Sequence, residues 1–297
     1  QSGIILIWPH EDTDWRPYLN EITEVYLQMA DAITRFEPLL ITARDTEKVH
    51  SLLAKRLTEG QMKHVTLFAC DNNDTWARDV APISLVSDKE PKGSLQALRL
   101  LDFCFNGWGE KFAAEKDNRI NRQLYEAGLL QGVLENHKDF VLEGGSIESD
   151  GDRTLFTTTG CLMAPHRNQP LTQEEIDKRL RLFFPNVERV VWLDYGQLAG
   201  DDTDGHIDTI VRVAPNHTLL YIGCDDKEDE HYEDFRLLEE QLKQLRTIDG
   251  ESYRLLRLPM PDAIYDDGER LPATHANFLI INGAVLVPTY NQPEKDK

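Results

Sequence analysis

The segment Gly205–Asp208 places a histidine, His206, two residues before a carboxylate, Asp208. The residues after the segment are mainly β-branched, which favours a strand over 207–213. Side chains at positions i and i+2 of a strand point the same way, so we expect the pair to face one pocket. A histidine beside a fixed carboxylate can accept and release a proton near neutral pH. The segment is therefore predicted to transfer protons.

Two more acidic residues stand after apolar, strand-like runs of sequence. One run leads to Asp79, and another leads directly into Glu143. An acidic run such as 201–204, taken alone, is more often a solvated loop than part of a site. The recurrence of carboxylates in this context instead indicates that Asp79, Glu143 and Asp208 converge on one site.

The ligand that suits such a group of acids is a planar cation. A guanidinium presents its N–H donors in a fixed fork, which carboxylates accept two at a time. Asp79, Glu143 and Asp208 would hold this cation, and His206 would carry the protons. The residues therefore favour a small cationic guanidino compound as the substrate.

Four motifs in this order resemble those of the agmatine deiminase family, and the similarity extends from Trp8 to Tyr290. The motifs occupy residues 76–79, 143–146, 205–208 and 277–283. That family belongs to the guanidino-group-modifying superfamily, which also contains arginine deiminases and peptidylarginine deiminases. The resemblance implies hydrolysis of agmatine to N-carbamoylputrescine and ammonia, a step of putrescine and polyamine biosynthesis that requires no cofactor and no metal.

The resemblance also implies a role for individual residues. Asp79 and Asp208 would hold the guanidinium, Glu143 would contact its nitrogens, and His206 would be the general acid and base. Trp76 would form a wall of the substrate pocket, although a core aromatic residue is an equal alternative. The neighbouring Arg78 is expected to point away from Asp79 and to form an ion pair or a subunit contact.

The nucleophile that the resemblance implies is a cysteine near the C-terminus, and we expect it beyond residue 297. The chain is accordingly interpreted as a core that lacks both ends. Four cysteines are present, and nothing beside them indicates an activated thiolate, so we interpret them as small buried hydrophobic residues. These are Cys70, Cys104, Cys161 and Cys224. Carboxylates next to Cys70 would raise the pKa of its thiol.

Three other functions compete with this interpretation. A peptidylarginine-type deiminase would be distinguished by a basic residue that binds a substrate carboxylate, which agmatine lacks, and Arg78 and Arg270 are the candidates. A non-catalytic guanidine-binding homologue would lack the nucleophile. A hydrolytic metal site is disfavoured because no second histidine cluster accompanies its ligands. Those ligands would be Asp201, Asp202, Asp204, His206 and Asp208.

Charge and composition narrow the class of partner. The chain has 297 residues, a formal net charge of −20 and a pI near 4.8, which argues against nucleic acid and favours cationic ligands. No apolar run approaches the length of a membrane span. The cysteines form no C-x-x-C pair, which fits a reducing compartment. We therefore expect a cytoplasmic protein without a membrane partner, and a homo-oligomer is compatible with the sequence.

Strands and helices recur in a repeating order of strand, helix, strand, acidic loop and hairpin. No linker interrupts 1–297, so a single α/β domain is predicted, with a polar surface loop over 87–94. The resemblance implies a five-bladed α/β propeller (the pentein fold) with approximate fivefold symmetry and a central site, here without its closing C-terminal segment. Strands are expected over 4–7, 38–41, 65–69, 153–157, 190–193, 207–213, 218–222 and 255–258, and helices over 19–33, 46–57, 118–127, 173–183 and 232–245.

Overall fold

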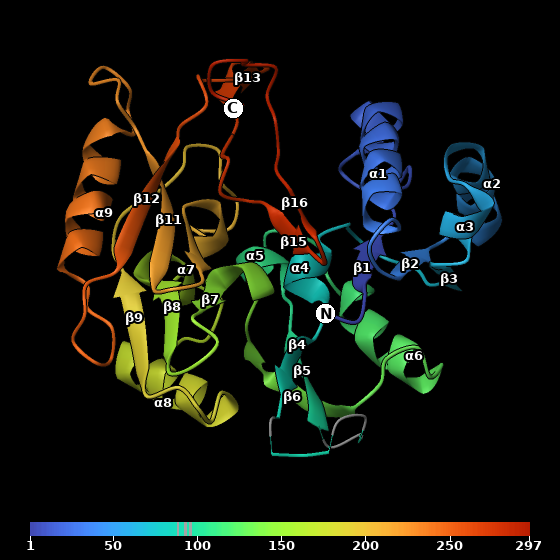
Figure 1. Ribbon diagram of the computed structural model, residues 1–297, viewed down its shortest axis with the longest axis horizontal. Helices are drawn as coiled ribbons and strands as arrows, with labels where there is room; N and C mark the ends of the chain where they lie inside the picture. Colours follow the sequence, from blue (N-terminus) through green and yellow to red (C-terminus); the bar gives the residue numbers. More distant parts are fainter. Residues whose placement is uncertain (88, 92–93, 95–96) are drawn as a thin grey trace. The chain divides into compact units, whose positions relative to one another are not determined.

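Short apolar runs form strands, and amphipathic runs between them form helices that cover the sheets (Figure 1). The computed structural model describes residues 1–87, 89–91, 94 and 97–297. Three positions of the polar loop expected over 87–94, namely 88, 92 and 93, lie outside the described residues. The chain forms two compact units: unit 1 contains residues 1–144 and 279–286, and unit 2 contains residues 145–278 and 287–297.

The first sheet of unit 1 consists of three parallel strands in the order β1–β2–β3. Helices α1 and α2 join these strands, and their apolar faces bury Ile33 and Leu53 beside Ile41 of the sheet. Asp45 caps α2 by accepting the Lys48 N–H, as an N-cap aspartate should. The elements are β1 (Ile4–Ile7), η1 (Arg16–Tyr18), α1 (Leu19–Ile33), β2 (Leu39–Ala43), α2 (Thr46–Arg56), α3 (Glu59–Met62) and β3 (Val65–Ala69).

The second sheet of unit 1 has the order β4–β5–β6, with an antiparallel hairpin followed by a parallel strand. A separate hairpin, β15–β16, turns at Asn282–Gly283 as that dipeptide predicts, and Gly283 has φ +89°. The elements are α4 (Ala77–Val80), β4 (Ile83–Val86), β5 (Leu98–Cys104), α5 (Gly107–Glu110), η3 (Asp117–Arg119), α6 (Ile120–Glu126), β6 (Val133–Val141), β15 (Leu279–Ile281) and β16 (Ala284–Leu286).

Unit 2 contains two three-stranded sheets, β7–β8–β9 and β10–β11–β12, each again a hairpin followed by a parallel strand. Helix α8 packs on β9 and helix α9 packs on β11. The elements are η4 (Gly144–Ser146, which begins at the last residue of unit 1), β7 (Ile147–Ser149), β8 (Thr154–Thr158), α7 (Thr159–Leu162), α8 (Gln173–Phe183), β9 (Arg189–Leu193), η5 (Ile207–Thr209), β10 (Val211–Ala214), β11 (Thr218–Gly223), α9 (Tyr232–Gln244), β12 (Arg254–Pro259), β13 (Tyr265–Asp266) and β14 (Glu269–Arg270).

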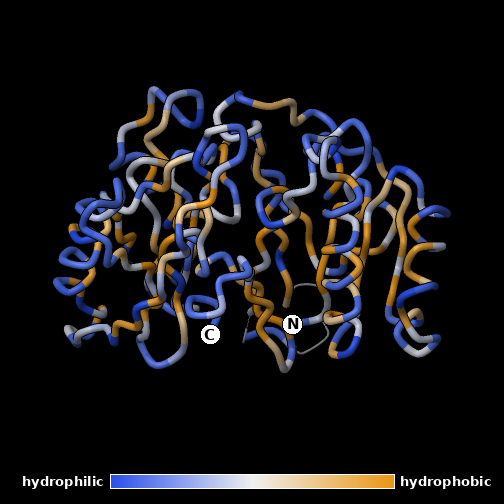
Figure 2. The backbone as a smooth tube through the Cα atoms, turned by 90° about the horizontal axis from the view of Figure 1, so that it is seen from above, coloured by the Kyte–Doolittle hydropathy of each residue, from blue (hydrophilic) through white to orange (hydrophobic). Residues whose placement is uncertain are grey.

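The predicted repetition is present in three of these sheets, which share the sequence of hairpin, connecting helix and parallel strand. Figure 2 shows hydrophobic residues along many strand segments and hydrophilic residues at the turns between them. The chain is therefore a mixed α/β protein, and none of the sheets within the described ranges closes on itself. None of the described helices has both the length and the apolar character needed to cross a bilayer.

One predicted strand begins later than expected. Residues 207–209 form the 3₁₀-helix η5, and β10 begins at Val211 rather than at position 207. Local side-chain bonds explain the difference. The Thr203 hydroxyl accepts the His206 N–H at 2.9 Å, and the Thr209 hydroxyl donates to the His206 carbonyl at 2.7 Å. These bonds occupy the backbone groups that a strand would offer to its neighbour.

Candidate active site

The turn after β3 carries Trp76 and Asp79 on the short helix α4. Trp76, at the N-cap, is 43% exposed, whereas Asp79 is buried at 8% exposure. Arg78 is exposed, as expected, but the alternation argument behind that expectation was wrong because this segment is helical rather than extended. The turn therefore directs one carboxylate inward and leaves one indole accessible.

Trp108 holds the Asp79 carboxylate through a hydrogen bond that none of the sequence motifs predicted. Its Nε1–H donates to Asp79 Oδ2 at 3.1 Å. Trp108 has φ +54°, which is unusual for a bulky residue, and it stands between Gly107 and Gly109, which also have positive φ. A Cβ on Gly107 would lie 2.0 Å from the Phe112 carbonyl oxygen. A tryptophan between two glycines is the feature of the sequence that could have predicted this strained loop.

Glu143 follows β6 and is fully buried. The glycine after it packs against the turn that carries Asp79, because a Cβ on Gly144 would lie 2.1 Å from the Arg78 carbonyl oxygen. The Glu-Gly-Gly-Ser motif thus needs its first glycine for a close backbone approach. Within unit 1, the structure brings the turns of Asp79 and Glu143 together, as predicted.

Two buried carboxylates support the turn that leads to Trp76. Asp117 accepts the backbone N–H groups of Asn73 at 2.7 Å and of Asp74 at 3.2 Å. Asp74 in turn accepts the Thr75 N–H at 2.8 Å. Burial raises the pKa of both Asp74 and Asp117 to about 6, because desolvation outweighs these hydrogen bonds.

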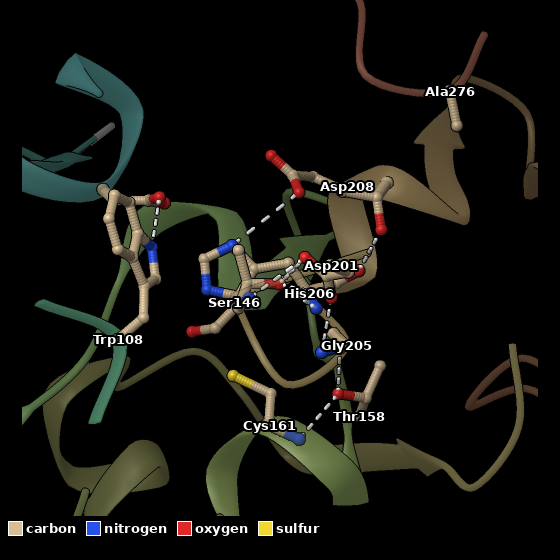
Figure 3. A network of polar contacts seen from close by, with 12 residues as sticks. Trp108, Ser146, Thr158, Cys161, Asp201, Gly205, His206, Asp208 and Ala276 are labelled. Carbon is tan, nitrogen blue, oxygen red and sulfur yellow. Dashed lines mark hydrogen bonds and ion pairs between the residues drawn. The ribbon is translucent and has the colours of Figure 1, made fainter. Parts of the chain in front are cut away.

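In unit 2, His206 and Asp208 lie on one side of the same 3₁₀ turn and are both 2% exposed. His206 Nδ1 and Asp208 Oδ1 are 4.0 Å apart, and Figure 3 shows the carboxylate directed toward the ring. This distance suits an ion pair with a protonated ring but is too long for a hydrogen bond. The predicted pairing is therefore confirmed, although a turn rather than a strand creates it.

The acidic residues before His206 stabilise the turn that they form. Asp201 accepts the N–H of Thr203 at 3.0 Å and that of Gly205 at 2.8 Å. The carboxylate of Asp204 accepts Arg167 Nη1–H at 2.5 Å. These bonds give the carboxylates of Asp201 and Asp204 a structural role, which disfavours these two residues as metal ligands.

The four cysteines are free thiols, and three of them are buried: Cys70, Cys161 and Cys224. Burial raises the pKa of Cys70, Cys104 and Cys224, and Asp71 raises that of Cys70 further. The sulfur of Cys161 lies within 4.8 Å of a ring nitrogen of His206 (Figure 3). Sequence reasoning interpreted Cys161 as a buried hydrophobic residue, and its 0% exposure agrees, but it did not predict this neighbour.

Arg270, a candidate for holding a substrate carboxylate, is already paired. Its guanidinium donates to Asp229 at 2.7 Å and to Glu230 at 3.1 Å. Burial by itself would raise the pKa of Asp229, but bonds from Arg270 and His231 hold it well below its ordinary value. His231 Nε2 also accepts the Ala199 N–H at 2.8 Å. This network fixes the loop before the acidic run rather than presenting a cation to a ligand.

Known proteins match nearly the whole of this chain. The family model described as Porphyromonas-type peptidyl-arginine deiminase matches residues 1–297. Agmatine deiminase of Pseudomonas aeruginosa is 30% identical over 312 aligned residues, which cover 97% of this chain and 81% of that protein. The chain therefore belongs to the Porphyromonas-type peptidyl-arginine deiminase family, and the resemblance inferred from the motifs is confirmed.

Two solved structures share the fold. One, from Porphyromonas gingivalis and provisionally described as an arginine deiminase, is 46% identical with a TM-score of 0.89, covering 98% of this chain and 83% of that chain. The other is a cysteine-to-serine variant of C. jejuni agmatine deiminase with substrate bound. It is 37% identical with a TM-score of 0.87, covering 98% of this chain and 80% of that chain.

Proposed function

We propose that this protein is an agmatine deiminase, a hydrolase that acts on the C–N bond of a guanidinium. The observation that carries the proposal is the burial of Asp79, Glu143 and Asp208, each at a motif position, together with the burial of His206 beside Asp208. Carboxylates away from water attract a cation more strongly than exposed ones. The P. aeruginosa and C. jejuni proteins named agmatine deiminase support the substrate.

The proposed mechanism has two steps. A cysteine thiolate adds to the guanidinium carbon, and ammonia leaves with a proton from His206. Water, activated by the same histidine, then attacks the resulting thiouronium, which releases the thiolate and the urea product, N-carbamoylputrescine. Asp79 and Asp208 hold the guanidinium during both steps, Glu143 contacts its nitrogens, and the accessible indole of Trp76 forms a wall of the pocket. No cofactor enters this scheme.

We further propose that the nucleophile is a cysteine outside residues 1–297. Burial raises the pKa of Cys70, Cys104 and Cys224, which opposes thiolate formation. Cys161 is close to His206 but lies outside the four motifs that carry the resemblance. The C. jejuni structure with substrate bound is a cysteine-to-serine variant, which supports a cysteine nucleophile in that relative.

A peptidylarginine-type activity is the second candidate, because the description of the matching family model names that substrate. It would require recognition of the peptide around the arginine. The engagement of Arg270 by Asp229 and Glu230 removes one of the two basic candidates for that task. This observation favours agmatine over a C-terminal peptidyl arginine, whose carboxylate such a residue would bind.

Three properties beyond the reaction belong to the same proposal. The repeated hairpin-and-parallel sheets support a five-bladed α/β propeller that forms a single catalytic domain. Four free thiols support a cytoplasmic location. The acidic net charge of −20 supports a cationic substrate and no nucleic-acid partner. A homo-oligomer would be detected by light scattering of the natural full-length protein.

A substrate panel tests the proposal. Ammonia release by the full-length protein is measured with agmatine, free arginine and N-benzoyl-arginine amide, the last as a model of peptidyl arginine. We expect kcat/KM to be highest for agmatine by at least about a hundredfold. A preference for the arginine amide would favour the peptidylarginine candidate, and binding of agmatine without ammonia release would identify a non-catalytic homologue.

A further inference from the structure

Arg167 is a buried cation that the proposed mechanism does not use. Its side chain has no exposed surface, and its guanidinium reaches the turn before His206. Nη1 donates to the Asp204 carboxylate at 2.5 Å, and Nη2 donates to the Thr203 carbonyl at 2.7 Å. One planar group therefore holds two consecutive residues of the turn in a fixed relation.

The conformation of the turn explains why such a clamp is useful. Asp204 has φ +63° and Gly205 has φ +94°, so two consecutive residues lie in the left-handed region. Glycine adopts this conformation freely, but a residue with a side chain does so at a cost. The ion pair with Arg167 stabilises Asp204 in this conformation, and the chain reverses direction there before it reaches His206.

The same turn is bonded to the backbone of His206. The Thr203 hydroxyl accepts the His206 N–H at 2.9 Å and donates to both oxygens of Asp201, at 2.7 and 2.8 Å. The Gly205 carbonyl accepts the Thr158 hydroxyl at 2.5 Å. Figure 3 shows Asp201, Gly205 and Thr158 near His206. Because the backbone sets the direction of the Cα–Cβ bond, the bonds determine where the ring points.

We propose that Arg167 is a positioning residue for His206 and acts through Thr203. The inference rests on the proposed function, in which His206 must protonate ammonia and then activate water. Proton transfer requires the ring within hydrogen-bond reach of each partner, and a displacement of about 1 Å can lower the rate on the order of a hundredfold. The clamp prevents that displacement without contact with the substrate.

The test uses a matched pair of variants in the full-length protein. Thr203→Val has nearly the shape of threonine but lacks the hydroxyl, whereas Thr203→Ser retains it. We expect Thr203→Val to lower kcat for agmatine by about ten- to a hundredfold with KM within about twofold, and Thr203→Ser to stay within about threefold of wild type. Arg167→Lys keeps the positive charge but loses the planar guanidinium that donates two hydrogen bonds at once. It should therefore lower kcat as Thr203→Val does.

A measurement without substrate tests the position of His206 independently of the proposed function. NMR of labelled histidine, with the His206 ring assigned by its loss in His206→Ala, should show shifted ring resonances in Thr203→Val and wild-type resonances in Thr203→Ser. Arg99→Lys is the control, because Arg99 also forms a two-bond ion pair, with Glu135 at 2.5 and 2.7 Å, but belongs to β5. It should leave both kcat and the His206 resonances unchanged.

The outcomes are distinct. A folded Thr203→Val with wild-type kcat and wild-type His206 resonances would overturn the proposal, as would a Thr203→Ser variant as impaired as Thr203→Val. If the resonances shift and serine restores them, but the wild type releases no ammonia from agmatine, the clamp stands and the proposed function fails. A folded Arg167→Lys with wild-type kcat and wild-type His206 resonances would also overturn the proposal. If Arg167→Lys does not fold, Asp204→Asn replaces it, because this variant loses the ion pair with Arg167 and asparagine tolerates the left-handed conformation.

Discussion

The turn that carries Asp79 and the turn that carries His206 both follow a strand and both contain carboxylates, yet different chemistry fixes each of them. Before Asp79, the carboxylates of Asp74 and Asp117 are buried against backbone N–H groups, and burial raises the pKa of both to about 6. Before His206, the Asp204 carboxylate instead pairs with the buried Arg167 guanidinium.

This difference has a consequence for how each turn responds to pH. A buried carboxyl that is held only by neutral donors gains a proton more easily than an exposed one. A carboxylate beside a guanidinium stays charged because arginine remains protonated at every ordinary pH. The turn before Asp79 is therefore expected to respond to mild acid.

The largest effect should come from the proton carrier of the second turn. His206→Ala is expected to lower kcat for agmatine by at least about a thousandfold, because one side chain serves both proton transfers. Far-ultraviolet circular dichroism should be unchanged. If this variant releases ammonia at a rate comparable to that of wild type, the proton carrier lies elsewhere.

The next largest effect should come from the acids of both turns. Asp79→Asn and Asp208→Asn are each expected to reduce kcat/KM for agmatine by at least about a hundredfold, since an amide keeps the shape but loses the charge that would hold the guanidinium in the proposed mechanism. Asp71→Asn is the control, because Asp71 is an exposed carboxylate that pairs with Arg44 and Lys116. Near-native kinetics in either test variant would remove that residue from the guanidinium site.

A smaller effect concerns stability and compares a buried carboxyl without a cation with a carboxyl that is paired. The folded state holds the Asp117 proton more tightly than the unfolded chain, so this group favours folding at low pH, and that contribution is lost as the pH rises from 3.8 to about 6. Asp117→Asn removes this dependence. Relative to wild type, its free energy of unfolding should rise by on the order of 2 kcal/mol between about pH 4.5 and about pH 7.5.

Asp229→Asn provides the comparison in unit 2. Arg270 and His231 lower the pKa of Asp229, so its carboxylate favours folding above the ordinary pKa of 3.8, and that contribution is lost as the pH falls toward its folded value. The variant should therefore lose stability relative to wild type at neutral pH. Urea titrations at the two pH values measure both variants. Relative to wild type, the free energy of unfolding should change in opposite directions in the two variants as the pH rises. A change in the same direction would contradict the contrast between a buried carboxyl without a cation and a paired one.

The smallest effect should come from the cysteines of this chain. Cys161→Ser in the full-length protein is expected to retain kcat within about threefold, although its sulfur lies within 4.8 Å of a His206 nitrogen. Cys70→Ser, at another buried thiol, is the matched control. Loss of ammonia release in Cys161→Ser without unfolding would make Cys161 the nucleophile and would overturn its assignment to a residue outside 1–297.

Much of the architecture could be predicted from local patterns. Helix α8 spans Gln173–Phe183 as predicted, because Thr172 and Glu175 form a capping box at its start. The hairpin at Asn282–Gly283 is likewise encoded by a dipeptide that favours its turn. Such signals depend only on residues a few positions apart, and they need no knowledge of the rest of the chain.

The chemical types at the candidate site were also evident in the sequence, because Asp79, Glu143, His206 and Asp208 belong to recognisable motifs. What only the tertiary structure decided is how these groups are held. Trp108 reaches Asp79 across 29 positions and Arg167 reaches Asp204 across 37. Bonds of this kind depend on which segments the fold brings together, and the spacing of residues along the sequence does not predict them. The sequence determined the reactive groups and their local turns, whereas packing between distant segments decided their orientation and their partners.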